Sequence, residues 1–366
     1  MNKHNRISNR LIVAGGGTGG HVLAGVAIAD CWKKAVSADA IFIGAVGGIE
    51  EKLVPRSGYQ LHLLSLGSLK GVGLGKQFKT LLKIPFALLI SFSLLIRYRP
   101  TAVIGVGGYA SGPFVLAARL IGWLWQTRVA ILEQNAVPGF TNRLLARFVD
   151  KIFSAFPGLE KSLPGNKVIL TGNPVRAEMK RLGPSSRKPF TVFIFGGSQG
   201  AVGINTLVLE ALPLLKDYHH LLKFIHQTGE KDYQRVFEGY EENKIEARVE
   251  KFIYEMAQAY EEASIVICRA GSSTLAEIAA VGRASVLIPF PQAADNHQEK
   301  NAQIFQDKKA ARMLRQSEAT GKTVADLLVE LLKDPEKIEE MERNVSFFHK
   351  PNAARDIVEA LLYSHI

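Results

Sequence analysis

A glycine-rich stretch near the start of the chain combines an anion-binding type of loop with a titratable side chain. It runs from Gly15 to His21 and follows the apolar residues 11–13. An apolar run, a series of glycines and a helical pattern from Val22 onward predict a strand, a tight turn and a helix. Backbone N–H groups at such a helix start favour a negatively charged or oxygen-rich ligand. The helix dipole also favours the neutral form of His21, which can accept a proton.

A second stretch of the same kind begins about half the chain length later. Gly196 to Ala201 follows the apolar run 192–195, just as the first stretch follows its own predicted strand. The chain has 366 residues, more than the ~250–300 at which single hydrophobic cores stop growing. We therefore predict two similar domains, each of which presents a glycine loop to a shared cleft.

Further polar motifs stand where other predicted strands end. In the first half they are Gly105–Pro113 and Glu133–Asn135, and in the second half Arg269–Glu277 and Pro289–Gln298. Ligands of α/β folds bind at the carboxyl ends of parallel strands, although helix capping is the structural alternative for each motif. The last of these loops is rich in hydrogen-bonding side chains and suits the recognition of sugar hydroxyls.

Two ligands common to such folds are disfavoured. The spelling Gly15-x-Gly17-x-x-Gly20 matches the dinucleotide fingerprint, but the predicted second strand, 40–44, does not end in the acidic residue that an NAD ribose requires. The chain also contains no Asp-x-Asp sequence that could chelate a metal-diphosphate. We therefore expect neither a cofactor nor a metal.

The positive charge of the chain is concentrated in its first half. Residues 1–172 hold 20 Lys and Arg against 7 Asp and Glu, whereas residues 173–366 hold 25 against 27. A basic half-molecule indicates an anionic partner, either nucleic acid or a membrane surface. No nucleic-acid-binding motif is visible, so we do not expect nucleic acid. The two cysteines form no Cys-x-x-Cys pair, which is typical of a reducing compartment.

The longest apolar stretch, 84–96, is too short to cross a bilayer. It contains 13 residues, where a spanning helix needs ~20. Basic residues flank it within a predicted helix over 77–99. We expect this helix to dock on an anionic membrane surface, and a core helix with a solvated rim is the alternative.

The order of predicted elements indicates the fold class. Strand-like runs alternate with helical patterns in both halves, which predicts an α/β protein with two doubly wound parallel sheets. We place an N-terminal domain at 1–172 and a C-terminal domain at 173–350. A last helix within 351–366 could pack back on the N-terminal domain.

Taken together, the motifs resemble those of the MurG family of bacterial cell-wall glycosyltransferases over nearly the whole chain. Two departures are visible: Leu132 stands where the family often has His, and His297 where the family has Gln. The residues that carry the resemblance are the first glycine loop with His21, 107–113, 133–135, 172–176, 196–201 with Asn205, and 269–298.

The resemblance implies a GT-B fold of two Rossmann-like domains separated by a cleft. It implies an inverting transfer of N-acetylglucosamine from UDP-N-acetylglucosamine to the C4 hydroxyl of the muramyl sugar of undecaprenyl-pyrophosphoryl-MurNAc-pentapeptide (lipid I). The product, lipid II, serves peptidoglycan synthesis and hence cell shape and division. The N-terminal domain would take this polyprenyl-pyrophosphate-linked acceptor at the cytoplasmic face of the inner membrane, with the protein bound peripherally.

The resemblance also assigns roles to individual residues. The catalytic base is either His21 or Glu133, with His21 preferred because imidazole titrates near neutral pH. In the donor site, Glu277 would bind the ribose, the backbone near Ile253 the uracil, and Gln298 the sugar hydroxyls. The acceptor-binding residues would be Thr18, Gly19, Gly20, Tyr109 and Asn135. The donor-binding residues would be Arg176, Ser198, Gln199, Gly200, Asn205, Ile253, Ser272, Ser273, Thr274, Glu277, His297 and Gln298.

Two other classes of function remain open at this stage. Another UDP-sugar enzyme of the same fold, such as a glycolipid synthase or a UDP-N-acetylglucosamine 2-epimerase, would use the same donor loops. A 2-epimerase would not need the basic, apolar helix 77–99. A non-catalytic peripheral membrane protein that binds lipid would need that helix, but it would leave the glycine loops unexplained.

Overall fold

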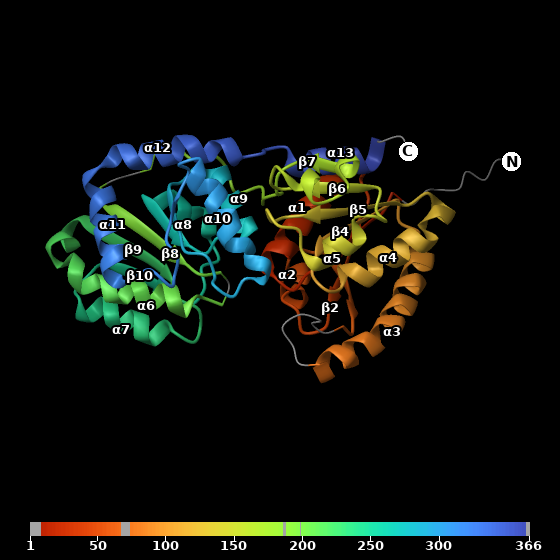
Figure 1. The fold of residues 1–366 in the computed structure, drawn as a ribbon, viewed down its shortest axis with the longest axis horizontal. Helices are drawn as coiled ribbons and strands as arrows, with labels where there is room; N and C mark the ends of the chain where they lie inside the picture. The colour runs from red at the N-terminus through yellow and green to blue at the C-terminus, as the bar shows by residue number, and fades with distance from the viewer. Residues whose placement is uncertain (1–8, 67–73, 186–187, 198, 364–366) are drawn as a thin grey trace. The chain divides into compact units, whose positions relative to one another are not determined.

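The structure is a computed structural model that describes residues 9–66, 74–185, 188–197 and 199–363, with 74–82 described by backbone alone. Ser198, which we predict to contact the diphosphate, lies outside the described residues. The chain divides into two compact units, and Figure 1 shows the elements of each. Unit 1 consists of Met1–Arg176 and Lys350–Ile366, and unit 2 of Ala177–His349.

Unit 1 is built on a parallel sheet in the strand order β3-β2-β1-β4-β5-β6-β7. The order reverses between β1 and β4, and this switch point is where ligands bind in such sheets. The prediction of a doubly wound sheet is confirmed for this half. The strands are β1 (Leu11–Gly15), β2 (Ala40–Ala45), β3 (Gln60–Leu64), β4 (Ala102–Gly107), β5 (Arg128–Glu133), β6 (Lys151–Ser154) and β7 (Val168–Leu170).

Helices cover both faces of this sheet because successive side chains of a strand point to opposite faces. In β1, Leu11 and Val13 belong to a core shared with α1 and α13, while Ile12 and Ala14 belong to a core shared with α3 and α4. The helices are α1 (Gly19–Val36), α2 (Glu50–Arg56), α3 (Leu74–Tyr98), α4 (Ser111–Ile121), α5 (Phe140–Leu145) and α13 (Ala353–Tyr363), with short 3₁₀ turns at Gly122–Trp125, Leu159–Lys161 and Gly165–Lys167.

The last helix, α13, completes the core of unit 1. It packs beside α1 (Figure 1), and its Ile357 and Leu361 are buried in the same cluster as Trp32 of α1. Its final carbonyls, those of Leu361 and Leu362, accept hydrogen bonds of 2.8 and 2.7 Å from Arg128 of β5. A cation at a helix C-terminus is favourable because it opposes the negative end of the helix dipole.

Unit 2 repeats the architecture with a parallel sheet in the order β10-β9-β8-β11-β12-β13. Its strand order reverses between β8 and β11. The doubly wound prediction is therefore confirmed for this half as well. The strands are β8 (Phe190–Phe195), β9 (Leu222–Gln227), β10 (Ala247–Glu250), β11 (Ile265–Cys268), β12 (Ser285–Leu287) and β13 (Arg312–Met313).

The helices of unit 2 also lie on both faces of its sheet. Val192 and Ile194 of β8 join a core with α6 and α11, whereas Phe193 packs edge-on against Tyr260 of α8. The helices are α6 (Val202–Ala211), α7 (Tyr233–Glu242), α8 (Met256–Glu262), α9 (Ser272–Val281), α10 (His297–Asp307), α11 (Gly321–Lys333) and α12 (Pro335–Val345), with 3₁₀ helices at Leu212–Leu221, Ala294–Asn296 and Ser346–Phe348.

Candidate functional site

The first glycine loop lies at the switch point of the unit 1 sheet. The N–H of Gly16 donates to the carbonyl of Gly107 over 3.1 Å, which joins the loop after β1 to the end of β4. Gly15 has a φ of +144°, and a Cβ there would lie 2.2 Å from the oxygen of Gly107. Only glycine permits this approach. The two loops are thus in direct backbone contact, as the sequence pattern predicts for a ligand-binding edge.

A buried carboxylate that the sequence analysis missed holds this loop in place. Glu50, in the first turn of α2, is 1% exposed. Its two oxygens accept hydrogen bonds of 2.8 Å from the N–H groups of Gly17 and Ala45. A Cβ at Gly16 or Gly48 would lie 2.3 Å from the Glu50 carboxyl group. In the sequence, Glu50 looks like any acidic residue at a helix start, so nothing distinguished it from its exposed neighbour.

His21 is oriented by the same loop. Its Nδ1 lies 2.9 Å from the carbonyl oxygen of Gly16, and a carbonyl can only accept, so Nδ1 carries the proton. The lone pair of the neutral ring is therefore on Nε2. Thr18 caps the helix by accepting a hydrogen bond from the His21 N–H over 3.3 Å. The ring packs over Gly107, where a Cβ would lie 2.9 Å from Nε2.

Glu133, the last residue of β5, is 2% exposed and fully engaged. One oxygen accepts from the backbone and side-chain nitrogens of Asn135, at 2.9 and 3.4 Å. The other accepts from the Gly139 N–H at 2.9 Å and from the Asn142 side chain at 2.8 Å. A carboxylate offers about four lone-pair positions. These four donors therefore commit Glu133 to shaping the loop that follows β5.

The remaining predicted acceptor residues lie at the same edge of the unit 1 sheet. Gly19 and Gly20 form the first turn of α1, after Thr18. Tyr109 is 41% exposed in the loop between β4 and α4, and Asn135 follows β5. The structure thus collects these residues at the carboxyl ends of three neighbouring strands, β1, β4 and β5.

The second glycine loop forms a tight turn at the end of β8. The carbonyl of Gly197 accepts the Gly200 N–H over 3.0 Å and the side chain of Gln227 over 2.8 Å. Gly200 has a φ of +75°, and a Cβ there would lie 1.9 Å from the oxygen of Thr228. The turn is therefore pressed against the end of β9.

Asn205, which we predicted as a donor ligand, lies buried beneath this turn. Its side-chain NH₂ donates to the carbonyl of Thr228 over 3.0 Å and to Asp232 over 2.7 Å. Its oxygen accepts from Nε2 of His226 over 3.1 Å. The amide is 1% exposed and engaged on both sides. Through these hydrogen bonds, Asn205 stabilises the end of β9.

The backbone near Ile253 is only partly available for a base. The N–H of Ile253 donates to Oε1 of Gln227 over 2.8 Å, and the residue is 3% exposed. Its carbonyl is the backbone group that remains for contact with a uracil. Gln227 was not among the predicted site residues, because an amide inside a strand gives no sign of the loops that it meets.

Glu277 lies on α9, whose first turn contains the predicted residues Ser272, Ser273 and Thr274. This turn begins just after β11, so its N–H groups face the carboxyl edge of the sheet. Glu277 is 8% exposed, and the Tyr260 hydroxyl donates to its Oε2 over 3.3 Å.

The loop after β12 is held by side chains on both of its flanks. Arg269 is buried and donates to the carbonyls of Ile288 and Pro289, and burial lowers its pKa to about 10. Gln298 accepts the N–H of Phe290 over 3.0 Å, which fixes its amide. His297 donates from Nδ1 to the carbonyl of Ala294 over 2.6 Å.

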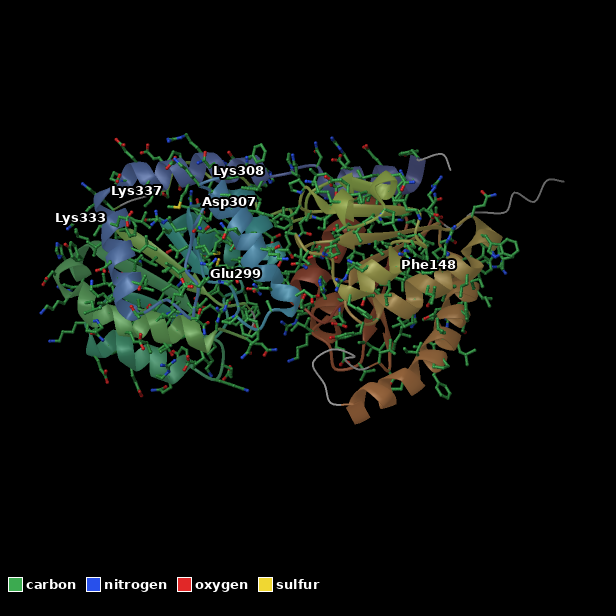
Figure 2. All side chains as sticks on the ribbon, viewed as in Figure 1. Phe148, Glu299, Asp307, Lys308, Lys333 and Lys337 are labelled. Carbon is green, nitrogen blue, oxygen red and sulfur yellow. The ribbon has the colours of Figure 1, made fainter. Side chains whose placement is uncertain are left out.

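Glu299, labelled in Figure 2, accepts hydrogen bonds from Arg315 and Asn296, and the Arg315 contact is the main reason that its pKa is lowered. Arg176 is partly buried at the end of the unit 1 segment.

Within the described ranges, no cluster of three or more His, Cys, Asp or Glu side chains could hold a metal ion. In the same ranges, no helix has the length and apolarity needed to cross a bilayer.

Comparison with known proteins gives matches over both units. The glycosyltransferase family 28 N-terminal domain matches residues 11–154, and the family 28 C-terminal domain matches 191–361. Curated relatives from Myxococcus xanthus and Citrifermentans bemidjiense are each 42% identical, over 96% of this chain and 91% and 99% of their own lengths. Both are named UDP-N-acetylglucosamine--N-acetylmuramyl-(pentapeptide) pyrophosphoryl-undecaprenol N-acetylglucosamine transferase.

Solved structures show the same pattern. MurG of Acinetobacter baumannii matches with a TM-score of 0.77 and 30% identity, over 96% of this chain and 99% of its own. A UDP-N-acetylglucosamine 2-epimerase of Neisseria meningitidis, bound to UDP-N-acetylglucosamine, matches with a TM-score of 0.67 over 96% of this chain and 99% of its own. Its identity is 13%, which indicates a shared fold alone.

The buried His226 predicts a specific pH dependence of stability. Burial lowers its pKa to about 3, while the unfolded chain titrates it near the ordinary value of 6.5. Between these two pKa values, His226 binds a proton in the unfolded state but not in the folded state. The free energy of unfolding of unit 2 should therefore fall by up to about 1.4 kcal/mol per pH unit as the pH drops below 6.5. Hydrogen exchange of β9 amides at pH 4 to 7.5 would measure it.

The matched substitutions are His226→Gln and His219→Gln, the second at an exposed histidine of the same unit. His226→Gln should flatten the curve between pH 4 and 6.5 relative to wild type, while His219→Gln should not. If the free energy of unfolding had the same pH slope in wild type and His226→Gln, His226 would not be the source of the pH dependence.

Proposed function

Because this chain belongs to glycosyltransferase family 28, we propose that it catalyses the reaction for which its curated relatives are named. That reaction transfers N-acetylglucosamine from UDP-N-acetylglucosamine to an N-acetylmuramyl-(pentapeptide) linked through pyrophosphate to undecaprenol. The observation that carries the proposal is 42% identity over 96% of the chain, with family 28 domains matched in both units. The chain is a glycosyltransferase, and we assign it the muramyl C4 hydroxyl as acceptor and a place in peptidoglycan synthesis.

The hypothesis that the chain is a 2-epimerase has weaker support than the transferase proposal. Solved structures named as 2-epimerases share between 10% and 13% identity with this chain, which indicates the fold alone. A 2-epimerase rearranges its nucleotide sugar without an acceptor, so it has no use for a lipid-facing surface. The transferase assignment explains both the donor loops and the apolar surface of unit 1.

We assign the role of catalytic base to His21. Its Nδ1 proton is held by Gly16, so Nε2 carries the lone pair that can take the proton of the acceptor hydroxyl. As that proton leaves, the acceptor oxygen bonds to the anomeric carbon and the bond from this carbon to UDP breaks, which inverts the configuration. Glu133 is less suited because four N–H donors already occupy its oxygens. It shapes the acceptor loop instead.

The donor is assigned to unit 2. The turn Gly197–Gly200 and the first turn of α9 offer backbone N–H groups and hydroxyls for the diphosphate. The positive end of the α9 dipole also stabilises its negative charge. Glu277 binds the ribose hydroxyls, and the carbonyl of Ile253 meets the uracil. The sugar hydroxyls are assigned to Gln298 and His297. The charge of the departing UDP is assigned to Arg176, which is the last residue of the first segment of unit 1. Gln199, Ser272, Ser273 and Thr274 line the diphosphate turns.

The acceptor is assigned to unit 1. The first turn of α1, with Thr18, Gly19 and Gly20, takes the pyrophosphate, and Tyr109 and Asn135 position the muramyl sugar. The three elements that carry these residues follow β1, β4 and β5. Their common edge therefore supports one continuous acceptor site.

A membrane-facing surface is assigned to α3 and to the helices that pack against it. Phe86, Leu89 and Ile96 are 68%, 64% and 54% exposed on α3, and the side chains of Lys83, Arg97 and Arg99 are exposed too. α3 packs on α4 and α4 on α5, and Phe148, labelled in Figure 2, is exposed just beyond α5. Trp123 and Leu124, 72% and 54% exposed, extend the apolar area. We assign it to anionic lipid, with the protein bound peripherally at the cytoplasmic face of the inner membrane.

The transfer reaction can be tested directly. The purified chain should release UDP and transfer N-acetylglucosamine only when a polyprenyl-pyrophosphate-linked muramyl acceptor is present. Formation of an epimerised UDP-sugar without acceptor would replace the proposal with the 2-epimerase reading. Transfer to diacylglycerol instead would replace it with the glycolipid synthase reading.

His21→Ala should separate chemistry from binding. Turnover should fall by ~100-fold or more, because a general base typically contributes that much. UDP affinity, measured by calorimetry, should stay at the wild-type value. His62→Ala, at a partly exposed histidine of β3, serves as the control and should keep wild-type turnover. Near-normal turnover of His21→Ala would give His21 a structural role only.

Vesicle binding tests the lipid-facing surface. The protein should sediment with anionic vesicles at low salt and be released as salt rises, because each basic residue near an anionic surface contributes ~1 kcal/mol that salt screens. The double substitution Phe86→Ser and Leu89→Ser should weaken sedimentation, whereas Leu214→Ser, at an exposed leucine of unit 2, should not. Equal recovery in the supernatant with anionic and neutral vesicles would return α3 to the role of a core helix.

A further inference from the structure

Gln227 is placed to join two loops that do not touch through the sheet. It is the last residue of β9, which lies between β8 and β10, and it is 2% exposed. Its Nε2 donates to the carbonyl of Gly197 in the turn after β8, over 2.8 Å. Its Oε1 accepts the N–H of Ile253 in the segment after β10, also over 2.8 Å. The side-chain amide of Gln227 thus forms hydrogen bonds with the backbone of both segments.

The sheet itself cannot provide this link. Neighbouring strands are about 4.8 Å apart, so β8 and β10 are separated by about twice that distance. Ladder hydrogen bonds join each of them to β9 but not to one another. Beyond the strand ends, the side chain of Gln227 connects the Gly197 turn directly to Ile253.

We propose that Gln227 is a positioning residue for the nucleotide donor, a role that rests on the proposed function of unit 2. It sets the spacing between the turn assigned to the diphosphate and the Ile253 backbone assigned to the base. A nucleoside diphosphate spans both places, so its affinity depends on their distance. Uridine reaches only the Ile253 backbone and Glu277, so its affinity does not depend on the Gly197 turn. Holding both backbone segments before the donor arrives lowers the ordering cost of binding.

The chemistry of the side chain explains why glutamine serves here. The position needs a donor toward Gly197 and an acceptor toward Ile253, and a side-chain amide supplies one of each. A carboxylate could not donate to the Gly197 carbonyl. Asparagine keeps the same polar atoms but is one methylene shorter, so it cannot reach both partners at once.

Two neutral substitutions test the role in the full-length protein. Gln227→Met keeps the length and removes both hydrogen bonds, and Gln227→Asn keeps the amide but shortens its reach. Both should weaken UDP binding by about 10-fold or more in calorimetry, with uridine affinity changed by no more than about 3-fold. The KM for the UDP-sugar should rise, and the KM for the lipid-linked acceptor should stay constant.

Gln306→Met is the matched control. Gln306 also accepts a backbone N–H, that of Met313 over 2.9 Å, but it does so at the β13 edge of the sheet. It should leave both affinities unchanged and give the same order of thermal shift as the Gln227 variants. If Gln227→Met does not fold, Gln227→Asn provides the same comparison.

The outcomes separate the inference from the proposed function. A wild-type chain that binds no UDP would overturn the proposed function itself. With a wild-type chain that binds UDP and transfers sugar, an equal loss of UDP and uridine affinity would show a general structural role and overturn the inference. Unchanged UDP affinity, or full recovery of it by Gln227→Asn, would also overturn the inference.

Discussion

The candidate sites of both units depend on one constraint: the glycines of their loops have no side chains with which to fix the backbone. Their backbones are fixed from outside by buried polar groups of neighbouring elements. Glu50 accepts a hydrogen bond from the N–H of Gly17, and Gln227 donates one to the carbonyl of Gly197. A buried polar group without a partner is costly, so each contact stabilises the loop only while both sides are present. The shape of the loops is therefore specified in part by residues that the loops do not contain.

This division of labour explains what could be read from the sequence. Apolar runs followed by glycines predicted the strands, the turns and the doubly wound sheets, because those patterns are local. The strands β7 and β13 were not predicted, since with three and two residues they carry no periodicity. The helix after the second glycine loop, α6, begins at Val202, directly after the loop, and continues beyond Ala211 as a 3₁₀ segment.

The sequence predicts which strand ends carry the candidate residues, but it does not show which protein groups their side chains contact. Asn205 and Glu133 stand beside ligand-binding motifs, and sequence alone cannot distinguish a residue that meets the ligand from one that holds the loop. The structure shows their polar atoms engaged with protein groups. Glu50 and Gln227 escaped notice for the opposite reason, since Gly17 lies 33 positions from Glu50 and the two partners of Gln227 lie 30 and 26 positions away. Such contacts depend on how strands are ordered, which no local pattern reveals.

The place of α13 has a consequence for how the chain is made. Unit 2 occupies an uninterrupted segment, Ala177–His349, whereas unit 1 takes its last helix from the end of the chain. Ile357 and Leu361 of α13 belong to the same buried layer as Trp32, so this layer stays open until α13 has been added. During synthesis from the N-terminus, the second half of the molecule can thus complete its core before the first half can. Unit 1 therefore starts before unit 2 along the chain and is completed after it.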